Sequence, residues 1–368
     1  MYALIDGSRL MTEALVRAGA DVYIGYPITP ANNLYLFSGR RFRTFFAAPD
    51  EITTLQWMSG FSAAGRLPVT ATSFPGFALM VESINMAYMM ELPMVIVLVQ
   101  RLGPATGTAT SGAQGDISLL RGMISGGYSI PVLSTSEATD CWEISEIALK
   151  TAVNLRTPVI LLTSKEEVMT QFSFDLDRLK DIKPAKREYY EGKEEFIPYK
   201  RNIKGVPDYL SVANNKHQVR YTASTHNEKG ILEGITPGAL KNTLSIHEKI
   251  VNNLEDYLHF EYNKASGSET VIVSYGITAN AAREAAVRLS DEENPVSLLI
   301  PKTLLPVSKK YLDILSGYKN IVFAEENHSG LYAELIYGAG IPDHVHRVNA
   351  IGRMISPDEI IEEVKKHG

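Results

Sequence analysis

The chain has 368 residues, 45% of them hydrophobic and 21% charged, which is enough apolar material for two cores of ordinary size joined by a connector. Its formal net charge is −6 and it has no lysine- or arginine-rich block, so a general electrostatic affinity for nucleic acid or for acidic membranes is not expected. Its single cysteine, Cys141, excludes a disulfide framework, a cysteine-type zinc site and any iron–sulfur cluster held by this polypeptide alone.

The first twenty residues predict an amphipathic helix. Their apolar side chains fall on one helical stripe, formed by Leu10, Met11, Ala14, Leu15 and Ala18. Four charged residues interrupt the stretch, which is therefore neither a signal-peptide core nor a membrane-spanning segment. Together with the scarcity of cysteine, this predicts a protein of the reducing cytoplasm.

Strands and helices are expected to alternate over the rest of the first 164 residues. The predicted strands are the apolar runs at 21–26, 44–48, 69–73, 94–99 and 158–163. The predicted helices open at Thr29-Pro30, run from Asp50 to Gly65, lie near Phe77 to Met90, and run from about Glu137 to Leu155. Near-continuous apolar strands are typical of parallel sheets covered by helices on both faces, so a first α/β domain is expected over residues 1–164.

The following hundred residues, 165–265, differ in composition. They begin with a stretch dense in lysine, glutamate and tyrosine without a lasting period, which predicts an extended, irregular connector. A long helix from about Pro237 to Phe260 is expected to follow it.

The α/β rhythm returns over residues 266–368, where a second, smaller open parallel-sheet domain is expected. Its predicted strands lie at 270–276, 296–300, 320–326 and 344–350, and its predicted helices at 279–289 and 331–337. The last helix has clear start signals, because Ser356 caps it, Pro357 takes its first position and Glu359 completes a capping box.

Ligands of open parallel sheets collect beyond the carboxyl ends of the strands, where four loops of the first domain are unusual. The first loop, GYPITP at 25–30, places Pro27 and Pro30 on either side of Thr29. It is either a stiff helix start, with Thr29 as the cap and Pro30 in the first position, or part of a ligand site. In the second loop, Glu51 stands in the first turn of a helix, either as a partner of the helix dipole or as a functional carboxylate.

The third and fourth loops offer glycines and an arginine. Gly76 follows a proline where a strand meets a helix, a place where the backbone can approach another group closely. Residues 99–116, VQRLGPATGTATSGAQGD, form a long glycine- and threonine-rich loop of a kind that is more often functional than decorative. Arg101 at its root is either a surface arginine or a fork of donors for a carboxylate or phosphate.

Conventional signatures of a reaction are absent. The sequence has no P-loop, no G-x-G-x-x-G that opens a helix after a strand, and no G-x-S-x-G elbow. The eight histidines form no metal-binding spacing; His344 and His346 alternate on a predicted strand and are interpreted as structural, so no metal ligand is predicted. Periodicity and spacing alone therefore predict a two-domain α/β protein with one rich loop cluster, and no particular reaction.

Taken together, however, these stretches resemble the alpha subunit of 2-oxoacid:ferredoxin oxidoreductases. The similar segments follow the same order over nearly the whole chain: GYPITP, DEITTLQWMSGFSAAG, TATSFPGFALMVE, VQRLGPATGTAT with QGD, HNEKG and FAEENHSGLYAELI. These enzymes use thiamine diphosphate to decarboxylate a 2-oxoacid oxidatively to an acyl-CoA, and the resemblance is strongest to the branch that acts on 2-oxoglutarate and related acids. It implies that residues 1–164 are the thiamine pyrimidine-binding domain and that residues 266–368 resemble the transketolase C-terminal domain.

The resemblance also implies roles for five residues. Pro27 and Ile28 would line the aminopyrimidine of the cofactor, and Thr29 would offer its hydroxyl to the substrate. Glu51 matches the glutamate that bonds the ring nitrogen N1′ and promotes the imino tautomer, a task that requires a carboxyl group in an apolar cleft. Arg101 matches the arginine that holds the substrate carboxylate and so orients the 2-oxo carbon.

Three positions depart from the family pattern. Phe74 and Leu102 stand where the related motifs carry glycine, and both add bulk near the cleft, which leaves the identity of the 2-oxoacid open. Asn227 stands where the related motif carries aspartate, and no role is assigned to it.

The chain also lacks parts that the reaction needs. It has no G-D-G…N motif to hold the diphosphate and magnesium, and no cysteine set for an electron relay. We therefore expect activity only with a beta subunit that brings the diphosphate site, Mg²⁺ and a [4Fe-4S] cluster, in an (αβ)₂ assembly that uses ferredoxin, coenzyme A and the 2-oxoacid. The family's gamma domain is missing, so its activity resides on a separate polypeptide or is dispensed with.

Two other hypotheses stay open. The chain could be a non-catalytic α/β subunit or binding module that kept the fold and lost the chemistry, although Thr29, Glu51 and Arg101 are all retained. It could also be another thiamine-dependent enzyme, such as a transketolase or dehydrogenase relative, although the missing diphosphate motif and the Q-R-x-G-P loop argue against this.

Overall fold

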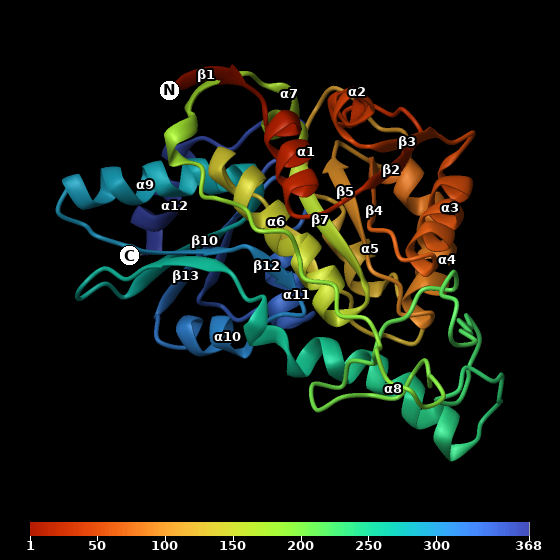
Figure 1. The fold of residues 1–368 in the computed structure, drawn as a ribbon. Helices are drawn as coiled ribbons and strands as arrows, with labels where there is room; N and C mark the ends of the chain where they lie inside the picture. The colour runs from red at the N-terminus through yellow and green to blue at the C-terminus, as the bar shows by residue number, and fades with distance from the viewer. Residues whose placement is uncertain (368) are drawn as a thin grey trace.

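A computed structural model describes residues 1–367, and its fold is α/β, as predicted (Figure 1). The strands are β1 (Tyr2–Ile5), β2 (Val22–Gly25), β3 (Thr44–Ala47), β4 (Pro68–Thr72), β5 (Met94–Gln100), β6 (Val132–Ser134), β7 (Pro158–Ser164), β8 (Phe172–Asp175), β9 (Phe260–Asn263), β10 (Thr270–Ser274), β11 (Ser297–Pro301), β12 (Thr303–Leu305), β13 (Asn320–Glu325) and β14 (Val345–Asn349). The helices are α1 (Gly7–Arg17), α2 (Asn32–Arg41), α3 (Glu51–Ala63), α4 (Phe74–Met89), α5 (Ile117–Gly122), α6 (Ala138–Leu155), α7 (Lys165–Met169), α8 (Pro237–Asn252), α9 (Ala279–Asp291), α10 (Lys309–Leu315), α11 (Leu331–Tyr337) and α12 (Pro357–His367). Across residues 1–367, no helix combines the length and the apolar character needed to cross a membrane.

The first sheet has seven strands in the order β12-β6-β7-β5-β4-β2-β3. Neighbouring strands run parallel, except that β12 pairs antiparallel with β6. Its central strands β5 and β7 are buried at every position, as their continuous apolar runs predicted. The edge strand β3 differs, because it has a neighbour on one side only, and its Phe46 is 41% exposed.

Helices cover both faces of this sheet. Helix α1 packs against α2, α6 and α7, whereas α3 packs against α4, and α4 against α8. The chain steps one way along the sheet from β2 to β3 and from β6 to β7, and the other way from β3 through β4 and β5 to β6. Right-handed crossovers in opposite directions place their helices on opposite faces. The predicted apolar stripe of α1 is confirmed, because Leu10, Met11, Ala14, Leu15 and Ala18 are all at most 1% exposed.

The second sheet has five strands in the order β14-β13-β10-β11-β9, with β9 as its one antiparallel strand. Alternate residues of β10 serve different cores. Val271 and Val273 join the core of the first sheet, while Ile272 faces a second core that includes Ile360 and Val364 of α12. The two sheets thus share apolar packing. In Figure 1 the red-to-yellow elements of the first sheet lie on the right and the blue elements of the second on the left.

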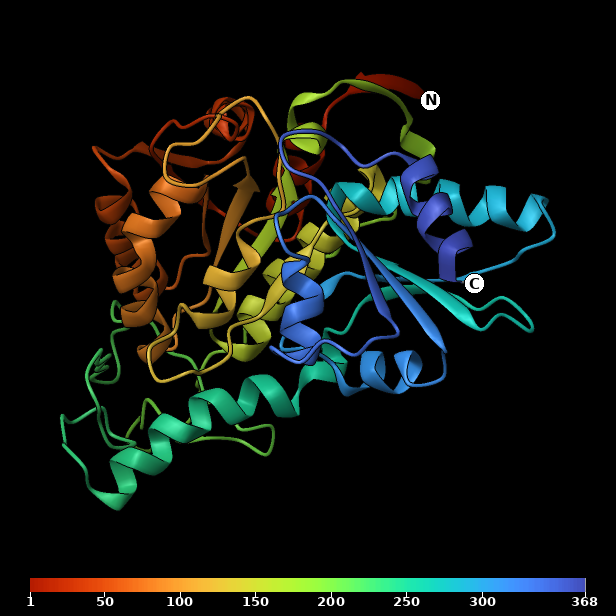
Figure 2. The ribbon, with the colours of Figure 1, turned by 180° about the vertical axis from the view of Figure 1, so that it is seen from behind.

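The green connector and α8 run along one end of the molecule in both ribbon views (Figures 1 and 2). Residues 179–236 contain no helix or strand, in agreement with the predicted irregular segment. Helix α8 ends at Asn252, earlier than predicted, because the chain turns there towards β9. The domain limits at 164 and 265 stay a prediction: β9 precedes residue 265 yet pairs in the second sheet, and β12 follows it yet pairs in the first.

A buried charge cluster ties the connector and α8 to the first sheet. Glu91, fully buried after α4, accepts hydrogen bonds from Arg201 of the connector at 2.8 Å and from Lys249 of α8 at 2.5 Å. Although burial opposes ionisation, the charges of Lys249 and Arg201 lower the pKa of Glu91 to about 2. The carboxylate is therefore ionised and paired, as a buried charge requires.

Candidate active site

Four loops meet at one edge of the first sheet. The parallel strands β5, β4, β2 and β3 are neighbours in that order, so the segments that follow their carboxyl ends lie side by side. These segments are the loops that the sequence singled out, at 26–31, 48–50, 73 and 101–116. The topology thus gathers the predicted site residues at the edge where parallel sheets bind ligands.

Arg101 and Thr29 are in direct contact across this edge. Arg101 follows β5 and is only 5% exposed, and its Nη1 donates a hydrogen bond of 2.6 Å to the Thr29 carbonyl oxygen. The Nε of Arg101 is buried without a partner among residues 1–367. Burial lowers the pKa of the Arg101 guanidinium, and the Asp116 carboxylate opposes that shift. Arg101 is therefore a buried cation that is fixed by the Thr29 carbonyl and keeps one N–H group without a partner. The interpretation of Arg101 as a surface arginine is wrong.

The predicted helix start at Thr29-Pro30 is wrong. Helix α2 begins at Asn32, with Ala31 in the capping position and no side-chain cap. The Thr29 hydroxyl does not bond a backbone N–H of the helix; it accepts a hydrogen bond of 2.9 Å from the Asn32 side chain. Residues 29–31 form a turn ahead of the helix, tied to Arg101 through the Thr29 carbonyl and to the Asn32 side chain through the Thr29 hydroxyl.

Pro27 and Ile28 have different environments. Pro27 is exposed, whereas Ile28 is half-buried and packs against the core. Their roles at a cofactor stay a prediction, but the contrast shows that the loop is anchored by Ile28 and presents Pro27 outwards.

Glu51 occupies the first position of α3 and is 6% exposed. The cap of this helix is its neighbour Asp50, whose Oδ1 accepts a hydrogen bond of 2.7 Å from the Thr53 N–H. Within residues 1–367 the Glu51 carboxylate accepts no hydrogen bond. Neither Glu51 oxygen is among the fully buried side-chain atoms that lack a partner, so the carboxylate keeps some contact with solvent and is open to a ligand.

Gly76, in the first turn of α4, lies directly against Glu51. A Cβ at position 76 would stand 2.4 Å from Glu51 Oε1 and 2.4 Å from Thr72 Oγ1, where no real side chain fits. The glycine therefore leaves the room that the Glu51 carboxyl occupies. The close approach that the sequence predicted for Gly76 is made to this carboxylate.

Gln114 was not among the predicted site residues, yet it ties the glycine-rich loop to the second sheet. Its fully buried side-chain amide donates a hydrogen bond of 2.6 Å to the Tyr275 carbonyl oxygen. The amide oxygen accepts hydrogen bonds of 2.8 Å from the Thr278 hydroxyl and from the Glu326 N–H. Gly276 has φ +60°, and a Cβ there would stand 2.7 Å from Gln114 Nε2. A buried network of this kind holds the carboxyl end of the loop that starts at Arg101.

Asp116 is a second residue that sequence reasoning missed. It is 5% exposed, its Oδ2 has no partner among residues 1–367, and burial raises its pKa to about 7 although Arg101 opposes the shift. Gln114 and Asp116 both belong to the QGD segment that was matched as a motif without assigned roles, so a signal was present.

The two bulky departures have different positions. Phe74 is half-buried at the first position of α4, two residues before Gly76. Leu102 is half-buried, and its Cδ2 is 3.7 Å from the place of a Cβ on Gly352, so this methyl group faces the loop that follows β14.

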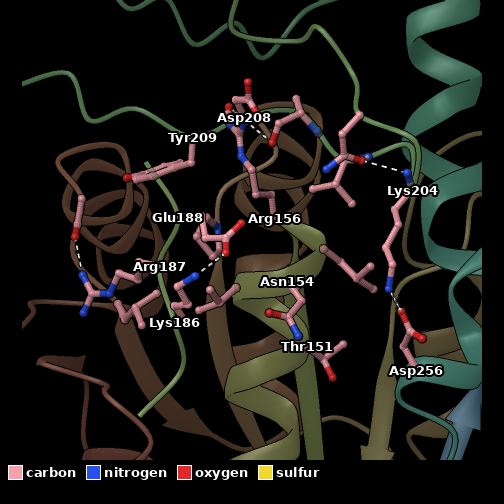
Figure 3. A pocket seen from close by; sticks show the side chains of 18 of the residues that line it. Thr151, Asn154, Arg156, Lys186, Arg187, Glu188, Lys204, Asp208, Tyr209 and Asp256 are labelled. Carbon is pink, nitrogen blue, oxygen red and sulfur yellow. Dashed lines mark hydrogen bonds and ion pairs between the residues drawn. The ribbon is translucent and has the colours of Figure 1, made fainter. Parts of the chain in front are cut away.

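A cavity of about 390 Å³ lies at the opposite edge of the sheet (Figure 3). It is lined by residues just before β4, β5 and β7 and by the connector, and none of the predicted site residues contributes to it. Some of its charges pair internally, Lys204 with Asp256 at 2.7 Å and Lys186 with Glu188 at 2.8 Å. Arg156 donates through Nη1 to backbone carbonyls, whereas its buried Nε and Nη2 have no partner among residues 1–367. The cavity therefore marks the seam between connector and sheet, away from the candidate site.

Comparison with known proteins identifies the family. Residues 13–232, more than half of the chain, match the family model described as pyruvate flavodoxin/ferredoxin oxidoreductase, thiamine diphosphate-binding. The chain belongs to this family. The match confirms the resemblance found in the loops and covers all four segments at the candidate site.

Relatives within the family align along the whole chain. The 2-oxoglutarate synthase subunit KorA of Methanocaldococcus jannaschii is 27% identical over 370 residues, 97% of this chain and 97% of that protein. The ketoisovalerate oxidoreductase subunit VorB of Methanothermobacter thermautotrophicus is 26% identical over 370 residues, 99% of this chain and 97% of that protein.

Solved structures agree with the fold. The 2-oxoglutarate:ferredoxin oxidoreductase from Magnetococcus marinus, with 2-oxoglutarate, coenzyme A and succinyl-CoA bound, superimposes with a TM-score of 0.92 and 25% identity. The superposition covers 100% of this chain but 65% of that one. A split-gene transketolase has a TM-score of 0.57 and 16% identity over 99% of this chain and 98% of its own, which shows a shared fold only.

Proposed function

We propose that this chain is the alpha subunit of an enzyme that oxidatively decarboxylates 2-oxoglutarate or a related 2-oxoacid to an acyl-CoA and passes the electrons to ferredoxin. The KorA relatives and the structural neighbour with 2-oxoglutarate and coenzyme A support the substrate class. The observation that carries the proposal is the partly buried contact between Arg101 and Thr29, made by two loops that the parallel sheet brings to its carboxyl edge.

The pyrimidine of thiamine diphosphate fits the residues around Glu51. This carboxyl is buried and free of hydrogen bonds within residues 1–367, and the missing Cβ of Gly76 leaves room for it. Glu51 would hold a shared proton at a ring nitrogen, and Pro27 and Ile28 would line the ring. When bound, the coenzyme supplies a nucleophilic carbon and an electron sink for decarboxylation.

Arg101 and Thr29 would bind the 2-oxoacid. The unpartnered Nε of Arg101 and the fork of donors around it suit a carboxylate, and the Thr29 carbonyl holds the guanidinium in place. A substrate held in this way is oriented before reaction, and such orientation can lower a barrier by several kcal/mol, on the order of 7–11 at best.

A beta subunit would complete the site. This chain has no motif for the diphosphate and no cysteine set, so we assign the diphosphate site, Mg²⁺ and the [4Fe-4S] cluster to that partner, in an (αβ)₂ complex. A partner that covers the outward-facing Pro27 would also close the cofactor pocket to water.

The test compares the chain alone with the chain co-purified with a beta subunit. Reduction of ferredoxin or a viologen dye that depends on coenzyme A and a 2-oxoacid is expected only from the complex. In the complex, Glu51→Gln is expected to abolish acceptor reduction without changing the melting temperature, whereas Glu284→Gln on the exposed side of α9 should leave activity unchanged. Robust activity of the lone chain, or near-normal turnover of Glu51→Gln, contradicts the proposal.

A further inference from the structure

A cluster of two histidines and a glutamate lies at the far end of the second sheet, away from the candidate active site. His346 stands on the edge strand β14, and Glu363 and His367 stand one turn apart on α12, which packs against β13 and β14. One ligand atom from each of the three side chains lies within 4.8 Å of the other two. The sequence could not reveal this set, because its members come from two separate elements.

The three side chains already contact one another. The rings of His346 and His367 stack at 3.6 Å with an interplanar angle of 5°, and His367 Nε2 is 3.3 Å from Glu363 Oε1. The other carboxylate oxygen, Oε2, pairs with Lys366 at 3.0 Å, so Oε1 is the oxygen that faces the histidines. Lys365 is turned to Glu292 instead, at 2.5 Å.

The donor types select the kind of ligand. Two imidazoles and one carboxylate are a set for a borderline transition-metal ion such as Zn²⁺, whereas Mg²⁺ and Ca²⁺ prefer oxygen ligands alone. Zinc–nitrogen bonds of about 2.0–2.1 Å place tetrahedral donors about 3.4 Å apart, close to the spread of up to 4.8 Å between the three donor atoms. A metal ion lies in the plane of each imidazole that binds it, so one of the two parallel rings has to leave the stack and turn towards the ion. His367, whose side chain is 37% exposed in the last turn of α12, has room for it.

The electrostatic surroundings are mixed, because Lys365 and Lys366 stand beside His367 in the last turn of α12, while the helix end itself attracts cations. The carboxyl end of a helix carries a partial negative charge, and Glu363 and His367 lie in the last turns of α12. Val348, on the same face of β14 as His346, is packed in the core with Ile360 and Val364, so strand and helix are already held together beside the cluster.

We propose that His346, Glu363 and His367 form a binding site for a Zn²⁺-class ion, with a fourth position open to water. The ion would link the end of α12 to the edge strand β14, and this proposal does not rest on the function assigned to the chain.

The test uses the full chain, free of any histidine tag and treated with a chelator, titrated with ZnCl₂ by calorimetry and with CoCl₂ by visible absorption. One Zn²⁺ per chain is expected, with a melting temperature that rises by several degrees at saturation and a Co²⁺ spectrum of a tetrahedral site. His346→Ala and His367→Ala should each weaken binding at least tenfold.

His344→Ala is the matched control, because it removes a histidine two residues from His346 that is not one of the three ligands. It should keep the affinity. His367 lies at the exposed end of a helix, so its removal leaves the core intact and tests the site without unfolding the chain. Absence of stoichiometric binding at 100 µM Zn²⁺, or an equal loss in His344→Ala and His346→Ala, would overturn the proposal.

Discussion

The contact between Gly76 and Glu51 allows a sharp test of the candidate site. In Gly76→Ala the new Cβ would stand 2.4 Å from Glu51 Oε1, and the shortest ordinary contact is 3.4 Å, so the carboxyl oxygen has to move by about 1 Å. A displacement of that size between reacting groups costs on the order of 100-fold in rate. The fold should largely survive, since crowding costs about 1–3 kcal/mol while alanine is about 1 kcal/mol better than glycine in a helix.

The assay is steady-state turnover of the chain with its beta subunit, together with thermal melting of each variant. Gly238→Ala is the matched control, because Gly238 also follows a proline in the first turn of a helix, α8, yet a Cβ there meets open space. We expect a turnover about 100 times lower for Gly76→Ala and unchanged for Gly238→Ala. A Gly76→Ala enzyme within threefold of the parent rate would show that the position of the Glu51 carboxyl does not limit turnover.

Three further predictions concern the glycine-rich loop. Arg101→Lys keeps the positive charge but loses the pair of guanidinium donors that can bind a carboxylate. The loss of one charged hydrogen bond should raise the KM for the 2-oxoacid about 10- to 100-fold, as measured by initial-rate kinetics. An unchanged KM would contradict a role of Arg101 in binding the substrate. Gln114→Ala leaves the Glu326 N–H and the Tyr275 carbonyl without partners, which costs about 1–3 kcal/mol of stability for each group. We therefore expect a lower melting temperature and a higher KM for the 2-oxoacid. A lower melting temperature with an unchanged KM would mean that Gln114 does not position the loop. Burial raises the pKa of Asp116 from 3.8 to about 7, so the folded state holds a proton that the unfolded state has lost, and stability declines as pH rises through that interval. The melting temperature of Asp116→Asn should therefore exceed that of the parent clearly at pH 8 and only slightly at pH 4.5. An equal increase at both pH values would rule out the titration of Asp116 as its cause.

Much of the fold follows from local patterns in the sequence. Continuous apolar runs predict β5 and β7, because a strand that is buried on both faces has apolar side chains at every position. Apolar residues repeated every three to four positions predict α1, because a helix buries one face only. The capping box before α12 is confirmed, with the Ser356 N–H donating to Glu359 Oε2 at 2.9 Å and the Glu359 N–H donating to Ser356 Oγ at 3.4 Å. Short pieces such as β1, β8 and β12 are missed, since their pairing comes from distant strands rather than from their own composition.

Local patterns were enough to single out the four loops of the candidate site, because the ends of parallel strands meet at one edge of a sheet and four unusual loops follow such ends. Which atoms meet at that edge became visible only in three dimensions: Arg101 donates to the Thr29 carbonyl, Gly76 leaves space for Glu51, and the second sheet holds the amide of Gln114. The two kinds of information differ in their range along the chain. Periodicity and capping are set by neighbours within one or two turns, whereas these contacts join residues far apart in the chain and depend on how the sheets pack, which no short window records.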